Sequence, residues 1–134
     1  MRSDDLGKLL LRLALGGLMI FHGIAKLISG PAGIKGMVAA AGLPEELGYF
    51  VYVGEFIAPL LLIIGLFTRP AALVIAGNMV VAVVLAHATQ LFTLNAKTGG
   101  WALELQAFFL FTALAIALLG PGGIRFGRRN DFWA

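Results

Sequence analysis

The sequence has 134 residues, of which 60% are hydrophobic and 13% are charged, whereas soluble domains carry about 25% charged residues. A soluble protein of this size could not bury so much apolar surface, because small domains keep a large fraction of their surface exposed. The net charge is only +3 and cysteine is absent, which argues against nucleic acid as a partner and excludes disulfides, thiol nucleophiles and iron–sulfur ligation. The composition therefore predicts an integral membrane protein.

Four segments contain the run of about 20 mostly apolar residues that a transmembrane helix needs. They are residues 6–28, 47–67, 70–92 and 101–119. We therefore expect a single all-α membrane domain over residues 1–134, folded as a four-helix bundle.

The connections between these spans differ in length. Residues 68–70 join the second span to the third, so we expect these two helices to be antiparallel neighbours, with Gly65 ending one and Pro70 in the first turn of the next. The connection over residues 29–46 is rich in glycine and proline. Within it, residues 34–43 are expected to form a short helix on the membrane surface, because they are too few to cross the bilayer.

Lysine and arginine gather on one side of the predicted bundle, and this bias sets the orientation of a membrane protein. The other side carries Lys35 and Lys97, with Lys26 near its edge. We therefore expect both termini in the cytoplasm, and the protein in the cytoplasmic (inner) membrane of a bacterium or archaeon. Arg12 lies one helical turn inside the inner surface and is expected to snorkel to it. The residues that define the cytoplasmic side are Arg2, Lys8, Arg69, Arg125, Arg128 and Arg129.

Every predicted span carries an ionisable residue in its outer half, at depths that follow from a helical rise of about 1.5 Å per residue. A charge at the centre of a bilayer costs at least about 2.5–3.5 kcal/mol. Glu55 lies too deep to snorkel, so it needs a partner, for which we expect Lys26 or a histidine. We interpret the group as a ligand-binding cluster, which consists of His22, Lys26, Glu55, His87 and Glu104. No metal site is expected.

Other residues of the predicted spans are expected to affect how the helices wind and pack around this cluster. Pro59 lacks the N–H that would bond the carbonyl of Glu55 in an α-helix, so we expect the helix to open there. Gly16, Gly17 and Gly23 are expected to allow close helix contacts, as small residues do in membranes. Asn78 and Gln106 are expected to form hydrogen bonds between helices.

A purely structural interpretation of the cluster stays open. A buried ion pair between Lys26 and Glu55 could serve only to fix which helix faces which. His87 could be a neutral histidine bonded to a backbone carbonyl.

Three stretches of the sequence resemble the DoxX family of small membrane proteins. They are "RLALGGLMIFHGIAKL", "GEFIAPLLLIIGLFTRPAAL" and "LELQAFFLFTALAIALLGPGGIRF", with His87 between the last two. The resemblance implies four helices and a redox association, since the related DoxD is a subunit of an archaeal thiosulfate:quinone oxidoreductase. The matching positions are Arg12, Gly16, His22, Gly23, Lys26, Glu55, Gly65, Thr68, Arg69, Glu104 and the turn 120–122.

Two classes of function follow. In the first, the protein is an accessory subunit of a quinone-linked oxidoreductase and binds a quinone-like or small apolar ligand in the outer half of the bilayer. A quinone needs proton donors and acceptors at its two carbonyls, and histidine and carboxylate supply them. A variant is haem b, with His22 and His87 as axial ligands.

In the second class the protein is not an enzyme. It would be a membrane scaffold, an assembly factor or a small-molecule carrier, surrounded by lipid and assembled as a homo-oligomer or with a partner subunit.

Overall fold

The computed structural model describes residues 2–86 and 88–126 and is almost entirely helical. The long helices are α1 (Ser3–Ser29), α5 (Thr68–Ala86) and α6 (Glu104–Leu119), and α2 (Ala32–Ala40) is short. The all-α prediction is confirmed. Within the described residues the strand-like pairing is a single bridge between Leu94 and Trp101.

The second long helical segment, residues 45–64, changes its winding along its length. It begins as a 3₁₀ turn (Glu45–Tyr49), continues through α3 (Phe50–Tyr52) and a π-helical turn (Val53–Ile57), and ends as α4 (Ala58–Ile64). The π-helical turn contains Glu55 and directly precedes the turn with Pro59, so the predicted opening of the helix beside Glu55 is confirmed.

Three helical segments of the described chain are long and apolar enough to cross a membrane, namely Ser3–Ser29, Glu45–Ile64 and Thr68–Leu85. The fourth, α6, is apolar but has 16 residues, which at the helical rise span about 24 Å against the roughly 30 Å of a hydrocarbon core. The third and fourth helices are shorter than predicted, because residues 91–103 form a loop. In that loop Asn95 N–H donates to the Gly100 carbonyl at 2.7 Å, and Ala102 N–H to the Thr93 carbonyl at 2.9 Å.

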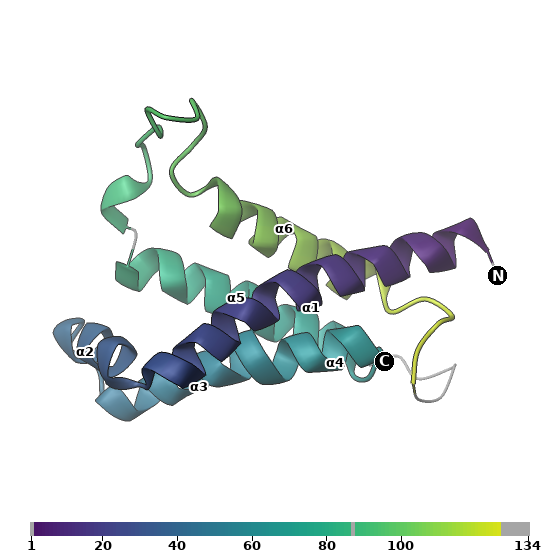
Figure 1. The fold of residues 1–134 in the computed structure, drawn as a ribbon, viewed down its shortest axis with the longest axis horizontal. Coiled ribbons are helices and arrows are strands. Elements are labelled where there is room, and N and C mark those ends of the chain that lie inside the picture. Colours follow the sequence, from purple (N-terminus) through teal and green to yellow (C-terminus); the bar gives the residue numbers. More distant parts are fainter. Residues whose placement is uncertain (1, 87, 127–134) are drawn as a thin grey trace.

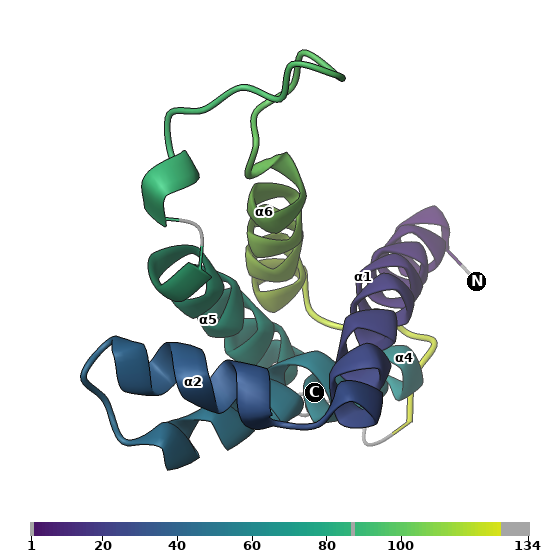
Figure 2. The same cartoon turned by 60° about the vertical axis from the view of Figure 1, so that its left-hand side comes forward.

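The four long segments form a ring in which each contacts two others. Helix α1 packs on α4 and α6, and α5 packs on α4 and α6 (Figures 1 and 2). Helix α2 lies across one end of this bundle, and the N-terminus of α1 lies at the other (Figure 1). At that second end Gly123 N–H donates to Asp5 Oδ1 at 2.9 Å, so the two ends of the described chain are neighbours.

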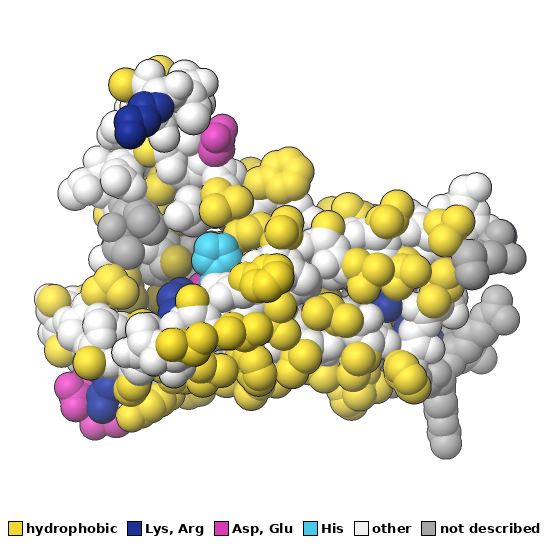
Figure 3. Space-filling model, in the orientation of Figure 1, with side chains coloured by type: hydrophobic (Ala, Val, Ile, Leu, Met, Phe, Trp, Pro, Cys, Tyr) yellow, Lys and Arg dark blue, Asp and Glu magenta, His cyan; other side chains and the backbone are white. Residues whose placement is uncertain are grey.

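The outside of the bundle carries many large apolar side chains. Figure 3 shows apolar side chains over most of one face. Large side chains that point outward include Phe21 and Leu118, which are 69% and 80% exposed. Such a surface is suited to lipid rather than water, and it agrees with a multi-pass membrane protein.

Two glycines of α1 let it approach the segment 53–64 closely. A Cβ on Gly23 would lie 2.1 Å from the carbonyl oxygen of Glu55, and one on Gly16 would lie 2.9 Å from that of Pro59. The close-contact prediction is confirmed for these two, which are two helical turns apart on one face. It is wrong for Gly17, where a Cβ would meet no atom within 4 Å, because this residue lies on another face of the helix.

Arg12 is buried at the end of the bundle opposite α2. Its side chain is 1% exposed, so the expected snorkelling does not occur. Its guanidinium donates to the carbonyls of Leu62 at 2.9 Å and Ile63 at 3.3 Å in the last turn of α4. It also donates to the carbonyls of Pro121 at 2.7 Å and Ile124 at 2.6 Å.

Arg69 acts in the same way at the end of α6. It donates to the carbonyls of Ala117 at 2.9 Å and Leu118 at 3.0 Å. The last carbonyls of a helix lack partners within the helix and carry its negative dipole end, so an arginine stabilises them by hydrogen bonding and by charge. Arg12 and Arg69 thus join α1 to α4 and α5 to α6.

Candidate functional site

Lys26 and Glu55 form an ion pair between α1 and the π-helical turn. Lys26 Nζ donates to Glu55 Oε2, and the Glu55 residue is only 4% exposed. The Tyr52 hydroxyl donates to the backbone carbonyl of Lys26 at 3.4 Å, which links α1 to α3, directly before the π-helical turn. The predicted partnership of Lys26 and Glu55 is therefore confirmed.

Local sequence explains how Glu55 reaches this position. Gly23 has no side chain, so α1 lies directly against the backbone of Glu55. On the other side, Gly54 lies so close to α5 that a Cβ there would come 2.7 Å from Asn78 Cβ. The π-helical turn is therefore held between α1 and α5, and π-helical turns occur frequently at functional sites.

The ion pair lies in the wall of two cavities. The first, which we call the polar cavity, has a volume of about 150 Å³. Besides the ion pair, its lining includes His22 from α1, Ala82 from α5, and Gln106 and Phe109 from α6. The second, which we call the middle cavity, has a volume of about 240 Å³ and is lined by Lys26, Glu55, Ala82 and residues of α2 and α5.

His22 contributes to the polar cavity from its lipid-facing side. Its ring meets the edge of Phe109 in a T-shaped contact, with 5.8 Å between the ring centroids, although the residue itself is exposed. A T-shaped aromatic contact fixes the orientation of a ring. The imidazole therefore has a defined place at the mouth of the cavity.

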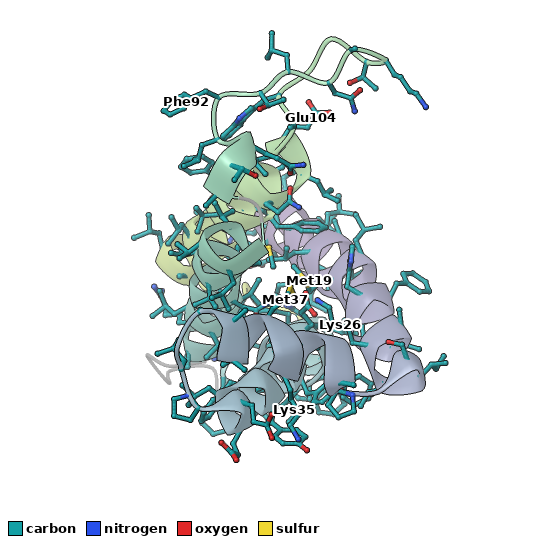
Figure 4. The ribbon with its side chains drawn as sticks, turned by 90° about the vertical axis from the view of Figure 1, so that its left-hand side faces the viewer. Met19, Lys26, Lys35, Met37, Phe92 and Glu104 are labelled. Carbon is teal, nitrogen blue, oxygen red and sulfur yellow. The ribbon has the colours of Figure 1, made fainter. Side chains whose placement is uncertain are left out.

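The structure does not bring Glu104 to this cavity. Glu104 is exposed in the first turn of α6, and Figure 4 shows it well away from Lys26 and Met19. The reason is the loop before α6, which uses residues 101–103 that we expected to be helical. Gln106, two residues further along, lines the cavity instead.

His87 lies outside the described residues. Its expected place in the cluster, and the haem b hypothesis that depends on it, therefore stay predictions. Among the described part of the chain, no group of three or more His, Cys, Asp or Glu side chains could hold a metal ion.

Helix α2 covers the middle cavity from the end of the bundle. Ile34 and Met37 of α2 line that cavity, and Figure 4 shows α2 in front of Lys26. The opposite face of α2 is held by Lys35, whose Nζ donates to the Tyr49 hydroxyl at 3.4 Å and lies 3.8 Å from Glu45 Oε1. The bond to Tyr49, together with the nearby carboxylates, raises the pKa of Lys35 above its ordinary value.

Asn78 and Gln106 were expected to form hydrogen bonds between helices and were not predicted to line the cavities, where the structure places them. Both are polar residues on otherwise apolar helices, which is the signal that could have identified them. The contribution of α2 had no such signal, because Ile34 and Met37 are ordinary apolar residues of a surface helix.

Comparisons with known proteins identify a family and two relatives. The sequence model of the family described as DoxX matches residues 7–88, a range that includes both members of the ion pair. The chain is 29% identical over 119 residues to the Bacillus subtilis (strain 168) protein named "Putative oxidoreductase CatD", which covers 89% of this chain and 83% of that protein.

A second relative comes from Haemophilus influenzae and is named only as an uncharacterized protein. It is 35% identical over 104 residues, which cover 75% of this chain and 76% of that protein. No solved structure matches the chain.

Proposed function

This chain belongs to the DoxX family, and from that premise we propose that it is a membrane redox component that binds a quinone-like ligand beside the Lys26–Glu55 ion pair. The name of the Bacillus relative points to the same broad class, oxidoreduction. In this proposal the protein lies in the cytoplasmic membrane and works with a redox partner that supplies electrons.

The observation that carries the proposal is the polar cavity. Its volume is about 150 Å³, and an engineered cavity of about 150 Å³ holds one benzene ring. Its lining combines a cation, a carboxylate, an imidazole and an amide from Lys26, Glu55, His22 and Gln106. Packing alone would favour filling such a space with apolar side chains, because cavities and buried charges both reduce stability.

These groups suit the chemistry of a quinone. Reduction of a quinone to a quinol adds two electrons from the partner and two protons at the two carbonyl oxygens. Lys26 and protonated His22 can donate hydrogen bonds to those oxygens, and Glu55 can take up and release protons beside them.

The proposal is tested by calorimetric titration of the purified protein in detergent with the tailless dimethoxy-methyl-benzoquinone ring. We expect saturable binding that is lost in His22→Ala and in Glu55→Gln. The matched control is Glu104→Gln, which changes a carboxylate that does not line the cavity and should bind as wild type does. Circular dichroism checks that each variant is folded.

Two results would overturn the proposal. One is the absence of quinone binding by folded wild-type protein. The other is equal loss of binding in Glu55→Gln and Glu104→Gln. The role of a membrane scaffold or carrier would then be the better explanation of the ion pair.

A further inference from the structure

A third hollow, which we call the apolar groove, lies beside the middle cavity. It has a volume of about 410 Å³, within the range of roughly 300–1,000 Å³ that is usual for ligand pockets. It runs between α2, the segment 47–54 and α5. Its lining is apolar except for Asn78, and several of its side chains are half exposed, among them Leu43 at 48% and Val74 at 42%. The groove therefore opens toward lipid.

The three hollows adjoin one another. The apolar groove and the middle cavity share Val51, Asn78, Val81 and Leu85. The middle cavity and the polar cavity share Lys26, Glu55 and Ala82. The three hollows thus lie next to one another, from a wide apolar groove to a small polar cavity, and the ion pair stands between the last two.

Helix α2 forms one side of the apolar groove and of the middle cavity. Val38 lines the apolar groove, and Ile34 and Met37 line the middle cavity. These positions are three and four residues apart, so they lie on one face of α2. That face shields these two hollows at the end of the bundle, and a ligand therefore enters from the side, out of the bilayer.

Three adjoining hollows of this kind fit an amphiphile with one apolar chain. We infer that the apolar groove holds the prenyl chain of the quinone whose ring lies in the polar cavity, with the chain passing Lys26 and Glu55 through the middle cavity. This inference rests on the proposed function. It adds that the chain, and not the ring alone, is recognised by the protein.

The inference predicts that affinity depends on the chain. The probes are the tailless dimethoxy-methyl-benzoquinone ring and the same ring with a short prenyl chain, titrated at equal detergent concentration. We expect the prenylated probe to bind roughly tenfold more tightly, the equivalent of about 1.4 kcal/mol.

Val74→Trp should remove this advantage by filling the groove. Val74 lines the groove but neither of the other two cavities. The variant should therefore bind the prenylated probe no better than the tailless ring, and bind the tailless ring as wild type does. The matched control is Val80→Trp on the same helix, since Val80 is 49% exposed and lines none of the three hollows. If Val74→Trp does not fold, Val53→Trp from the opposite wall replaces it.

The outcomes separate this inference from the proposed function. If the tailless ring binds and the chain adds nothing, the inference is wrong and the proposed function stands. If Val74→Trp and Val80→Trp weaken the prenylated probe equally, the chain does not lie in the groove. If wild-type protein binds neither probe, both proposals are overturned.

Discussion

Each end of the bundle has positively charged side chains that bond to a neighbouring helical segment, but the partners of these side chains differ between the two ends. At the end near the chain termini, the guanidinium of Arg12 is bonded to four backbone carbonyls and Arg69 to two. At the end near α2, Lys26 is paired with the carboxylate of Glu55, and the pair lies in the wall of two cavities.

This difference in partners distinguishes a structural role for the arginines from a functional role for the Lys26–Glu55 pair. Backbone carbonyls cannot take up a proton at any ordinary pH, so these bonds of Arg12 and Arg69 hold helices together. A carboxylate and an amine beside open space can exchange protons and meet a ligand. Charged side chains therefore have two roles in this bundle, helix attachment at one end and ligand contact at the other, and each role can be tested separately.

The largest expected effect is an all-or-none difference in reporter activity between the two ends of the bundle, which shows which end faces outward. From the charge bias we predict that the end with Arg12 faces the cytoplasm and that the ion pair lies in the outer half of the membrane. A reporter that is active only outside the membrane should be silent after Ala134 and active when inserted beside Lys97. The reverse pattern would place the ion pair in the inner half.

Arg12→Met should cause the largest loss of stability. It removes the hydrogen-bond donors of two carbonyls in the last turn of α4 and of two carbonyls in the segment after α6. A buried acceptor left without a partner costs about 1–3 kcal/mol. Because three of the four bonds are only partly buried, we expect less than the full cost for each, roughly 3–5 kcal/mol in total, measured by thermal unfolding in detergent.

The control for this variant is Arg12→Lys. It should recover only part of the loss, because an ammonium lacks the planar fork of donors that reaches several carbonyls at once. A methionine variant as stable as wild type would show that the arginine is not a structural tie.

Lys26→Met and Glu55→Gln should each destabilise the protein by about 2–3 kcal/mol. This loss is smaller than that expected for breaking a fully buried ion pair, because Lys26 is partly exposed. The double variant should be more stable than the sum of the single losses implies, since it leaves no lone buried charge. The measurement is the same thermal unfolding series. Strictly additive losses would mean that the two side chains are not coupled.

Gly23→Ala should destabilise the protein at the upper end of the roughly 1–3 kcal/mol usual for overpacking, because the added methyl group would press on the backbone of Glu55, which cannot move aside as a flexible side chain can. Gly17→Ala is the matched control, since an alanine there meets no atom within 4 Å. It should leave stability unchanged or raise it slightly, as alanine favours helix over glycine. Equal effects at the two positions would argue against the close contact at Gly23.

Local patterns were sufficient to predict the helices, the Lys26–Glu55 pair and the opened turn before Pro59. Long apolar runs, a carboxylate too deep to snorkel and a proline without an N–H are each visible within a few residues. The placement of Glu104 failed because a loop with its own hydrogen bonds replaced the predicted start of the last helix.

The role of Arg12 could not be read from the sequence. Its partners are carbonyls about 50 and 110 positions away along the chain, and a backbone carbonyl is present at every residue. The apolar groove and the middle cavity were equally hidden, because both arise where α2 packs across the end of the bundle. Tertiary packing, rather than residue type, creates both features.

The central claim is that the ligand binds at the end with Lys26 and Glu55. The most direct measurement is photolabelling of the folded protein with a photoreactive quinone analogue, followed by mapping of the labelled peptides by mass spectrometry. We predict label on residues 19–26 of α1 and 105–109 of α6, competed away by unlabelled quinone and absent in Glu55→Gln. Label concentrated around Arg12, or spread without competition over the lipid-facing helices, would contradict this claim.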